Sequence, residues 1–235
     1  PGAFGQLRRE RAMVRFDWRG TGESDRNRLP ATIDDLVADI DAVIRVAPGP
    51  VDALYFGTVC FAGLSHAARH PSHYRSIYVV GGALRQGGNR HGLNNRPGWE
   101  KNYLEHLRGL ALLTLGVNQA EAFSLAAGWQ DAVPREAYAA YLAVQQDIDL
   151  TAVLPTISIP ALVSASVPYD YESAALMAAL LPDATLSLMP PLDAQDIPRV
   201  RRDDWDRHLG SRFGEPPSQP LAAPPPMAHA LDTLS

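Results

Sequence analysis

The chain has 235 residues and a formal net charge of −5, and its hydrophobic content of 46% suits the core of one α/β domain with an insertion. This acidic balance argues against a nucleic-acid partner, because neutralising phosphates requires a concentrated basic surface. No apolar run reaches the roughly 18 residues of a membrane-spanning helix, and the single cysteine cannot form an internal disulfide. We therefore expect a protein with no membrane contact, located in the reducing cytoplasm.

The first part of the chain alternates between strand-like and helical segments. A strand is predicted from Ala12 to Phe16, and the glycine-containing loop 17–25 suits a tight turn better than a phosphate site. The capping box of Thr32 to Asp35 opens a helix that extends to about Val46, whose acidic residues, Asp41 among them, are expected to face mostly solvent. A further strand is predicted from Ser76 to Val80. This alternation predicts a parallel sheet with helices on both faces.

The segment from Asp52 to Pro71 organises the rest of the chain. A short, fully buried strand is predicted from Ala53 to Gly57, and helical sequence runs from Ala62 to the stop at Pro71. In an α/β protein, such a strand-to-helix turn can hold a nucleophile beside the amides of a helix N-terminus. The candidates at this turn are Thr58, Val59 and Cys60.

A helical insertion separates the two halves of the predicted sheet. Residues 99–146 are expected to form three or four helices that are broken at Gly116, Gly128 and Pro134, and an insertion of this kind lies naturally over the carboxyl edge of the strands. The sheet then resumes. The predicted order is a strand at 161–165, a helix at 171–181, a strand at 184–189 and an amphipathic helix at 200–213, before a proline-rich segment.

Four units follow from this order. Residues 1–84 form the first part of the core, residues 85–150 the helical cap, residues 151–214 the second part of the core, and residues 215–235 a proline-rich linker or tail. Because the chain begins at Pro1, partway into its own pattern, we expect it to be a piece of a longer protein.

Several segments together resemble the α/β-hydrolase superfamily over residues 4–213. Residues 16–25 are similar to its D-x-R-G-x-G-x-S segment, residues 67–71 to the end of the helix that follows the nucleophile, and residues 159–163 and 173–182 to the strand and helix beside the catalytic acid. The resemblance implies an α/β-hydrolase fold with a helical cap, whose first strands and half of whose oxyanion hole would precede Pro1.

A narrower resemblance concerns the segment after the third predicted strand. Val80-Gly81-Gly82, followed by a polar stretch and a helical cap, looks most like the hydrolase-like domains that precede class III adenylate cyclases in bacteria. The proline-rich tail would suit the linker into such a cyclase domain, which the resemblance implies as a partner within the full-length chain.

The resemblance also implies positions for a catalytic triad of nucleophile, histidine and acid. Counting forward from Asp52 puts the nucleophile on Cys60, whereas aligning Gly57 with the first glycine of G-x-S-x-G puts it on Val59. The acid position falls on Ser166, with Asp170 as the nearest carboxylate one helical turn beyond. The histidine position falls on Ala194, and no histidine lies between His106 and His208.

The remaining candidates are weighed by residue chemistry. A thiolate at a helix N-terminus can have a lowered pKa, but a lone cysteine in an apolar turn is more often a small buried hydrophobe. His66, His70 and His73 have spacing that resembles a metal site, yet no carboxylate cluster joins them in the sequence, so neither a metal nor another cofactor is expected.

Three functions remain open. The first is a catalytically degenerate domain that senses a small molecule under the cap, through Val59, Phe61, Trp99 and Trp129, and regulates a bacterial signalling protein. The second is an active hydrolase of a small ester-like substrate that uses Cys60, a displaced acid and a histidine from the cap, His91 or His106. The third is a scaffold that only dimerises or packs against a neighbour.

Overall fold

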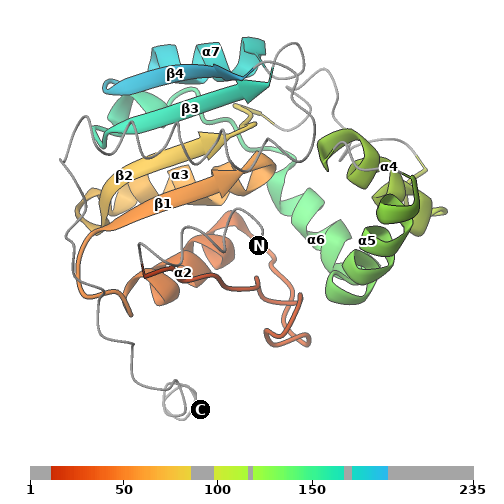
Figure 1. The fold of residues 1–235 in the computed structure, drawn as a ribbon. Helices are drawn as coiled ribbons and strands as arrows, with labels where there is room; N and C mark the ends of the chain where they lie inside the picture. Colours follow the sequence, from red (N-terminus) through yellow and green to blue (C-terminus); the bar gives the residue numbers. More distant parts are fainter. Residues whose placement is uncertain (1–11, 86–97, 116–118, 167–170, 190–235) are drawn as a thin grey trace.

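A parallel sheet forms the centre of the molecule (Figure 1). The computed structural model describes residues 12–85, 98–115, 119–166 and 171–189. Its four strands lie in the order β1-β2-β3-β4, and every neighbouring pair is parallel. The strands are β1 (Val51–Phe56), β2 (Tyr74–Val80), β3 (Ala161–Ser166) and β4 (Ala184–Met189).

Strand β1 is less buried than its sequence predicts. It occupies the edge of the described sheet, and only Tyr55 among its residues is buried. By contrast, β2 and β3 lie inside the sheet and are almost continuously buried, as expected for parallel strands rich in β-branched residues. An apolar run alone does not distinguish an edge strand from a central one.

The predicted strand at residues 12–16 is wrong. These residues have no regular secondary structure, and Val14 and Phe16 are exposed. None of the described strands pairs with this segment. Without backbone hydrogen bonds to a neighbouring strand, the extended conformation is not stabilised.

Helices α2 (Ile33–Ile44), α3 (Cys60–Arg69) and α7 (Tyr171–Leu180) complete the described part of the core. The predicted capping box is present, because the Asp35 carboxylate accepts a hydrogen bond from the Thr32 amide (3.0 Å). Helix α3 begins two residues earlier than predicted. The helix predicted at 200–213 lies outside the described residues, as does the segment 215–235.

The main hydrophobic core lies between the sheet and helices α3 and α7. It joins inward-facing residues of β1, β2 and β3 to one side of each helix, and its fully buried members include Phe61, Leu64, Ile77, Val79, Val163 and Met177. A second cluster packs α2 against α3 through Leu36, Ile40 and Ala62. Helix α2 is therefore attached to the sheet through α3.

Helix α3 approaches β1 closely because position 63 is a glycine. A Cβ atom at Gly63 would lie 2.5 Å from the ring of Tyr55, which is far inside van der Waals contact. The Tyr55 ring is buried and its hydroxyl lies 2.9 Å from that of Tyr74 in β2. The missing side chain thus sets the distance between the helix and the edge strand.

The glycine loop at residues 17–25 is a tight turn, as predicted. Gly20 and Gly22 both have positive φ angles, and a Cβ at Gly22 would overlap the Asp17 carboxylate. The guanidinium of Arg19 binds Asp39 and Asp35 of α2 at distances as short as 2.7 Å. These charge-assisted bonds attach the loop to α2.

The cap consists of α4 (Tyr103–Leu115), α5 (Gln119–Ala132) and α6 (Arg135–Gln145), which lie beside the sheet in Figure 1. Pro134 caps the start of α6 as expected, but the break predicted at Gly128 is wrong, because this glycine lies inside α5. Glycine in a helix interior costs only about 1 kcal/mol, which the neighbouring helix formers tolerate.

Several contacts place the cap relative to the core. Arg85 and Asp149 form an antiparallel bridge and an ion pair of 2.8 Å, which brings the two ends of the insertion together. The hydroxyl of Tyr141 in α6 donates to the carbonyl oxygen of Arg19 (2.9 Å). Every helix among the described residues is too short or too polar to cross a lipid bilayer.

The contact between Gly63 and Tyr55 generates a prediction. Gly63→Ala should lower the free energy of unfolding by about 1–3 kcal/mol, since the added methyl group must displace a buried ring. Gly128→Ala is the matched control. Nothing lies within 4 Å of a Cβ at that position, so it should stabilise the helix by about 0.5–1 kcal/mol.

Urea denaturation of the two variants measures both effects. If Gly63→Ala were as stable as the unmodified chain, the helix would not be held at this distance from β1.

Candidate functional site

The corner between β1 and α3 is occupied by a glycine. Strand β1 ends at Phe56, the single 3-10 turn Gly57–Val59 follows, and α3 begins at Cys60. Gly57 has a φ angle of +53°, in the left-handed region that side-chain-bearing residues rarely adopt. In a hydrolase-type elbow, the nucleophile sits on this strained strand-to-helix turn. The corner residue here has no side chain.

Cys60 lies three positions beyond the corner and faces the core. Its side chain is fully buried, and Sγ donates a weak hydrogen bond to the carbonyl oxygen of Ala83 (3.6 Å). The backbone after β2 lies directly against the sulfur, since a Cβ at Gly82 would be 3.4 Å from it. Burial raises the pKa of the Cys60 thiol to about 12, so the thiol is protonated at neutral pH.

The two turn residues predicted to contact a ligand flank Cys60. Phe61 is fully buried in the main core, and Val59 is half-buried and packs against the same cluster. Both side chains thus contribute to packing between α3 and the sheet. Their ligand-binding role stays a prediction.

The two cap tryptophans belong to one aromatic cluster within the cap. Trp99 is buried, its ring lies 4.9 Å from that of Tyr138 and 5.9 Å from that of Tyr103, and Trp129 packs against the edge of the cluster. This arrangement joins α4, α5 and α6. A ligand-binding role for Trp99 and Trp129 also stays a prediction.

Of the predicted acid and histidine positions, the structure describes only one. Ser166 is the last residue of β3 and pairs with Met189 at the carboxyl end of the sheet. Asp170 and Ala194 lie outside the described residues. The catalytic role of Asp170 therefore stays a prediction.

Two described histidines are held by tyrosines. His106, from the cap, lies with Nε2 2.8 Å from the hydroxyl of Tyr138. His66, from α3, lies with Nδ1 2.7 Å from the hydroxyl of Tyr74. The hydrogen bond of Cys60 goes to a main-chain oxygen and not to an imidazole.

A polar network that the sequence did not predict runs beneath α3. The hydroxyls of Tyr55 and Tyr74 bond to each other, Tyr74 contacts His66, and His66 Nε2 lies 3.4 Å from Oδ1 of Asp41. Burial lowers the pKa of His66 to about 4, which leaves its ring neutral at physiological pH. Burial likewise raises the pKa of both tyrosines.

This network corrects two sequence interpretations. Asp41 does not belong to a fully solvated face, since it is half-buried between α2 and α3. The argument that no carboxylate joins His66 and His73 is also wrong, because Asp41 approaches both from α2. The spacing along the chain gives no signal for this, because the contact depends on how two helices pack.

Two of the hollows on the surface of the described residues are relevant to the site. One, of about 760 Å³, lies on the cap, and the other, of about 240 Å³, lies between the end of α2 and the turn before β2. Residues 57–60 line neither hollow. The cap hollow is lined by residues 100–105, 130–131 and 134–136.

The solved structures similar to this chain include hydrolases and esterases. An esterase from Rhodococcus matches with a TM-score of 0.71 at 17% identity, covering 88% of this chain and 83% of that one. The chain has the α/β-hydrolase fold. A hydrolase from Oleispira antarctica matches this fold with a TM-score of 0.67 at 19% identity, covering 80% of this chain and 76% of the other.

A third structure extends the comparison. A lipase-esterase related protein from Clostridium acetobutylicum matches with a TM-score of 0.64 at 14% identity, covering 87% of this chain and 86% of that protein. No protein-family model matches the sequence, and no curated protein is significantly similar to it. These structures confirm the predicted α/β-hydrolase fold and leave the activity of this chain open.

The buried thiol gives a prediction. Cys60 in the folded chain should react with an aromatic disulfide reagent at least about a hundredfold more slowly than in denaturant, because its sulfur is enclosed and protonated. Stopped-flow absorbance measures both rates on the same sample, with the denatured chain as the control. Equally fast modification under native conditions would place the thiol at an accessible surface.

Proposed function

We propose that this chain is an α/β-hydrolase-fold domain without catalytic activity that serves as a regulatory or ligand-sensing module of a cytoplasmic bacterial signalling protein. The observation that carries the proposal is Gly57 at the nucleophile corner. An attacking group must be held above the carboxyl end of the sheet, and a glycine supplies none.

The surroundings of Gly57 indicate that the nucleophile is missing and that no neighbouring residue has taken over its role. A Cβ at Gly57 would meet nothing within 4 Å, so the corner has room for a side chain that this sequence does not provide. The nearest thiol, Cys60, has turned into the core, where its raised pKa suppresses the thiolate. Without a nucleophile and its general base, the expected loss of rate is several orders of magnitude.

The regulatory part of the proposal rests on what the domain retains. The cap is well packed on its own aromatic cluster and is tied to the core through Tyr141 and the bridge between Arg85 and Asp149. A fold that keeps its cap after losing its chemistry is suited to transmit a binding event. The link to a downstream adenylate cyclase rests on the sequence resemblance around Val80-Gly81-Gly82 and the proline-rich tail.

Ester hydrolysis tests the proposal. Purified protein and the Cys60→Ala variant should both hydrolyse p-nitrophenyl acetate and butyrate no faster than buffer alone, because neither Gly57 nor the buried thiol of Cys60 can attack an ester. Initial rates of nitrophenolate release are followed by absorbance, with an active esterase as the positive control for the assay.

Either of two outcomes would overturn the proposal. Saturable turnover that disappears in Cys60→Ala would show an active cysteine hydrolase, the second function considered for this sequence. Turnover that survives the substitution would place a nucleophile elsewhere and would contradict the loss of catalysis equally.

A further inference from the structure

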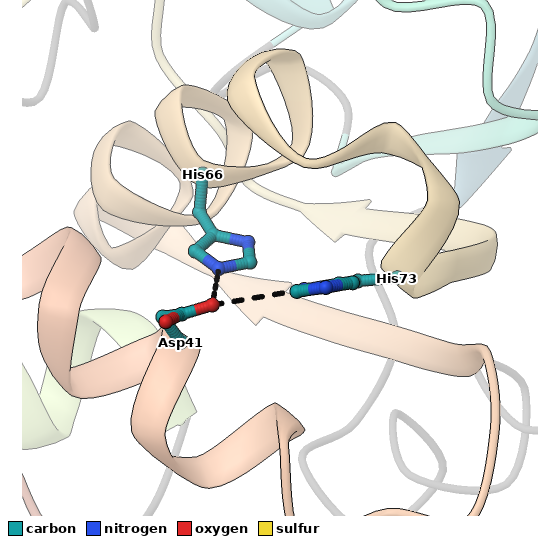
Figure 2. A group of neighbouring side chains, drawn as sticks. All are labelled: Asp41, His66 and His73. Carbon is teal, nitrogen blue, oxygen red and sulfur yellow. Dashed lines mark hydrogen bonds and ion pairs between the residues drawn. The ribbon is translucent and has the colours of Figure 1, made fainter.

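Three potential metal ligands converge from three separate elements of the fold (Figure 2). Asp41 comes from α2, His66 from α3, and His73 from the 3-10 turn Pro71–His73 that precedes β2. One oxygen of Asp41, Oδ1, lies 3.4 Å from Nε2 of His66 and 3.7 Å from Nδ1 of His73. The three ligand atoms all lie within 4.8 Å of one another.

These separations suit a shared cation better than direct hydrogen bonds. A charge-assisted N–H to carboxylate bond is about 2.7–2.9 Å long, which is clearly shorter than either contact. Around a tetrahedral ion with bonds of about 2.0–2.1 Å, neighbouring ligand atoms lie about 3.3 Å apart. The separation between Asp41 and His66 is close to that value, and the one to His73 needs a small movement.

An unsatisfied nitrogen is the second observation that points to a ligand. Nδ1 of His73 is buried, has no hydrogen-bond partner, and points toward Asp41 (Figure 2). Buried polar atoms in native proteins almost always have a partner. A cation between His73 and Asp41 would provide one.

The groups behind the ligands hold them in place. Tyr74 contacts Nδ1 of His66 at 2.7 Å, which leaves Nε2 directed at Asp41. Nε of Arg45 binds the other carboxylate oxygen, Oδ2, at 2.7 Å and leaves Oδ1 to the two imidazoles. Outer partners of this kind orient the ligands in known metal sites.

We propose that Asp41, His66 and His73 form a binding site for one divalent transition-metal ion, with Zn²⁺ as the best-fitting species. Two imidazoles and a carboxylate are a donor set that Zn²⁺ accepts in tetrahedral sites, with water in the fourth position. The hollow of about 240 Å³ is lined by Arg45 and His73 and so lies beside the three ligands.

The proposed metal site lies far from the Gly57 corner, so it is independent of any chemistry there. In the parallel pair of β1 and β2, Val51 pairs with Tyr74 at one end and Phe56 with Val80 at the other. His73 directly precedes Tyr74, whereas the corner at Gly57 directly follows Phe56, so the two sites lie at opposite ends of these strands. A bound ion would join α2, α3 and the start of β2, and the inference holds whether or not the domain hydrolyses esters.

Metal titration of the untagged 235-residue chain tests the site. After treatment with EDTA and its removal, Zn²⁺ should bind with a stoichiometry of one per chain in competition with a chromophoric chelator. At a hundredfold excess over the Kd, the ion should raise Tm by about 5–10 °C, and EDTA should reverse the shift.

Variants assign the ligands. His73→Ala and Asp41→Asn should each weaken Zn²⁺ binding by about a hundredfold or more, since even outer partners of metal ligands are worth 10- to 100-fold. His70→Ala is the matched control, because its ring stacks on His73 at 5.3 Å but lies outside the ligand set, and it should bind as the unmodified chain does.

The result that would overturn the inference is equally defined. The inference would be wrong if the unmodified chain bound no stoichiometric Zn²⁺. It would also be wrong if a folded His73→Ala variant bound Zn²⁺ with unchanged affinity. If both ligand variants failed to fold, the visible spectrum of the unmodified chain with Co²⁺ would decide. A spectrum identical to that of the aqueous ion would rule out the site, and the intense bands of a tetrahedral N/O complex would support it.

Discussion

The close packing of α3 on Tyr55 is the constraint on which the rest of the structure depends. Gly63 lets the helix lie directly on the ring, and the Tyr55 hydroxyl continues through Tyr74 and His66 to Asp41. One polar chain thus links β1, β2, α3 and α2 inside an otherwise apolar layer. Because buried polar groups are costly when unsatisfied, the short hydrogen bonds of this chain fix the relative positions of β1, β2 and α3, and Asp41 of α2 lies at its end.

The same packing sets the geometry of the corner between β1 and α3. Once α3 is held on Tyr55, the turn before it places Gly57 at the corner and directs Cys60 into the core, against the backbone of residues 82–83. An esterase of this fold needs its nucleophile at the corner, exposed and beside a base. Here the strand-to-helix turn is present, and the residue at its corner, Gly57, carries no side chain.

The sequence predicts the layout better than the site. Short β-rich apolar runs locate β2, β3 and β4, and a helical pattern locates α2, to within a few residues, because burial dictates those patterns locally. The corner residue escaped prediction because motif alignment favours Cys60 or Val59, and only the φ angle of Gly57 shows where the chain turns. The approach of Asp41 to His66 is likewise set by the packing of α2 against α3, so the spacing of residues along the sequence does not predict it.

A covalent probe of serine and cysteine hydrolases tests the central claim most directly. The folded chain is incubated with a fluorophosphonate and, separately, with a small chloroacetamide, and intact mass and peptide mapping locate any adduct. The account predicts no adduct on residues 57–60, because the corner has no nucleophile and the adjacent thiol is enclosed. Stoichiometric labelling of Thr58 or Cys60 in the folded protein would contradict it.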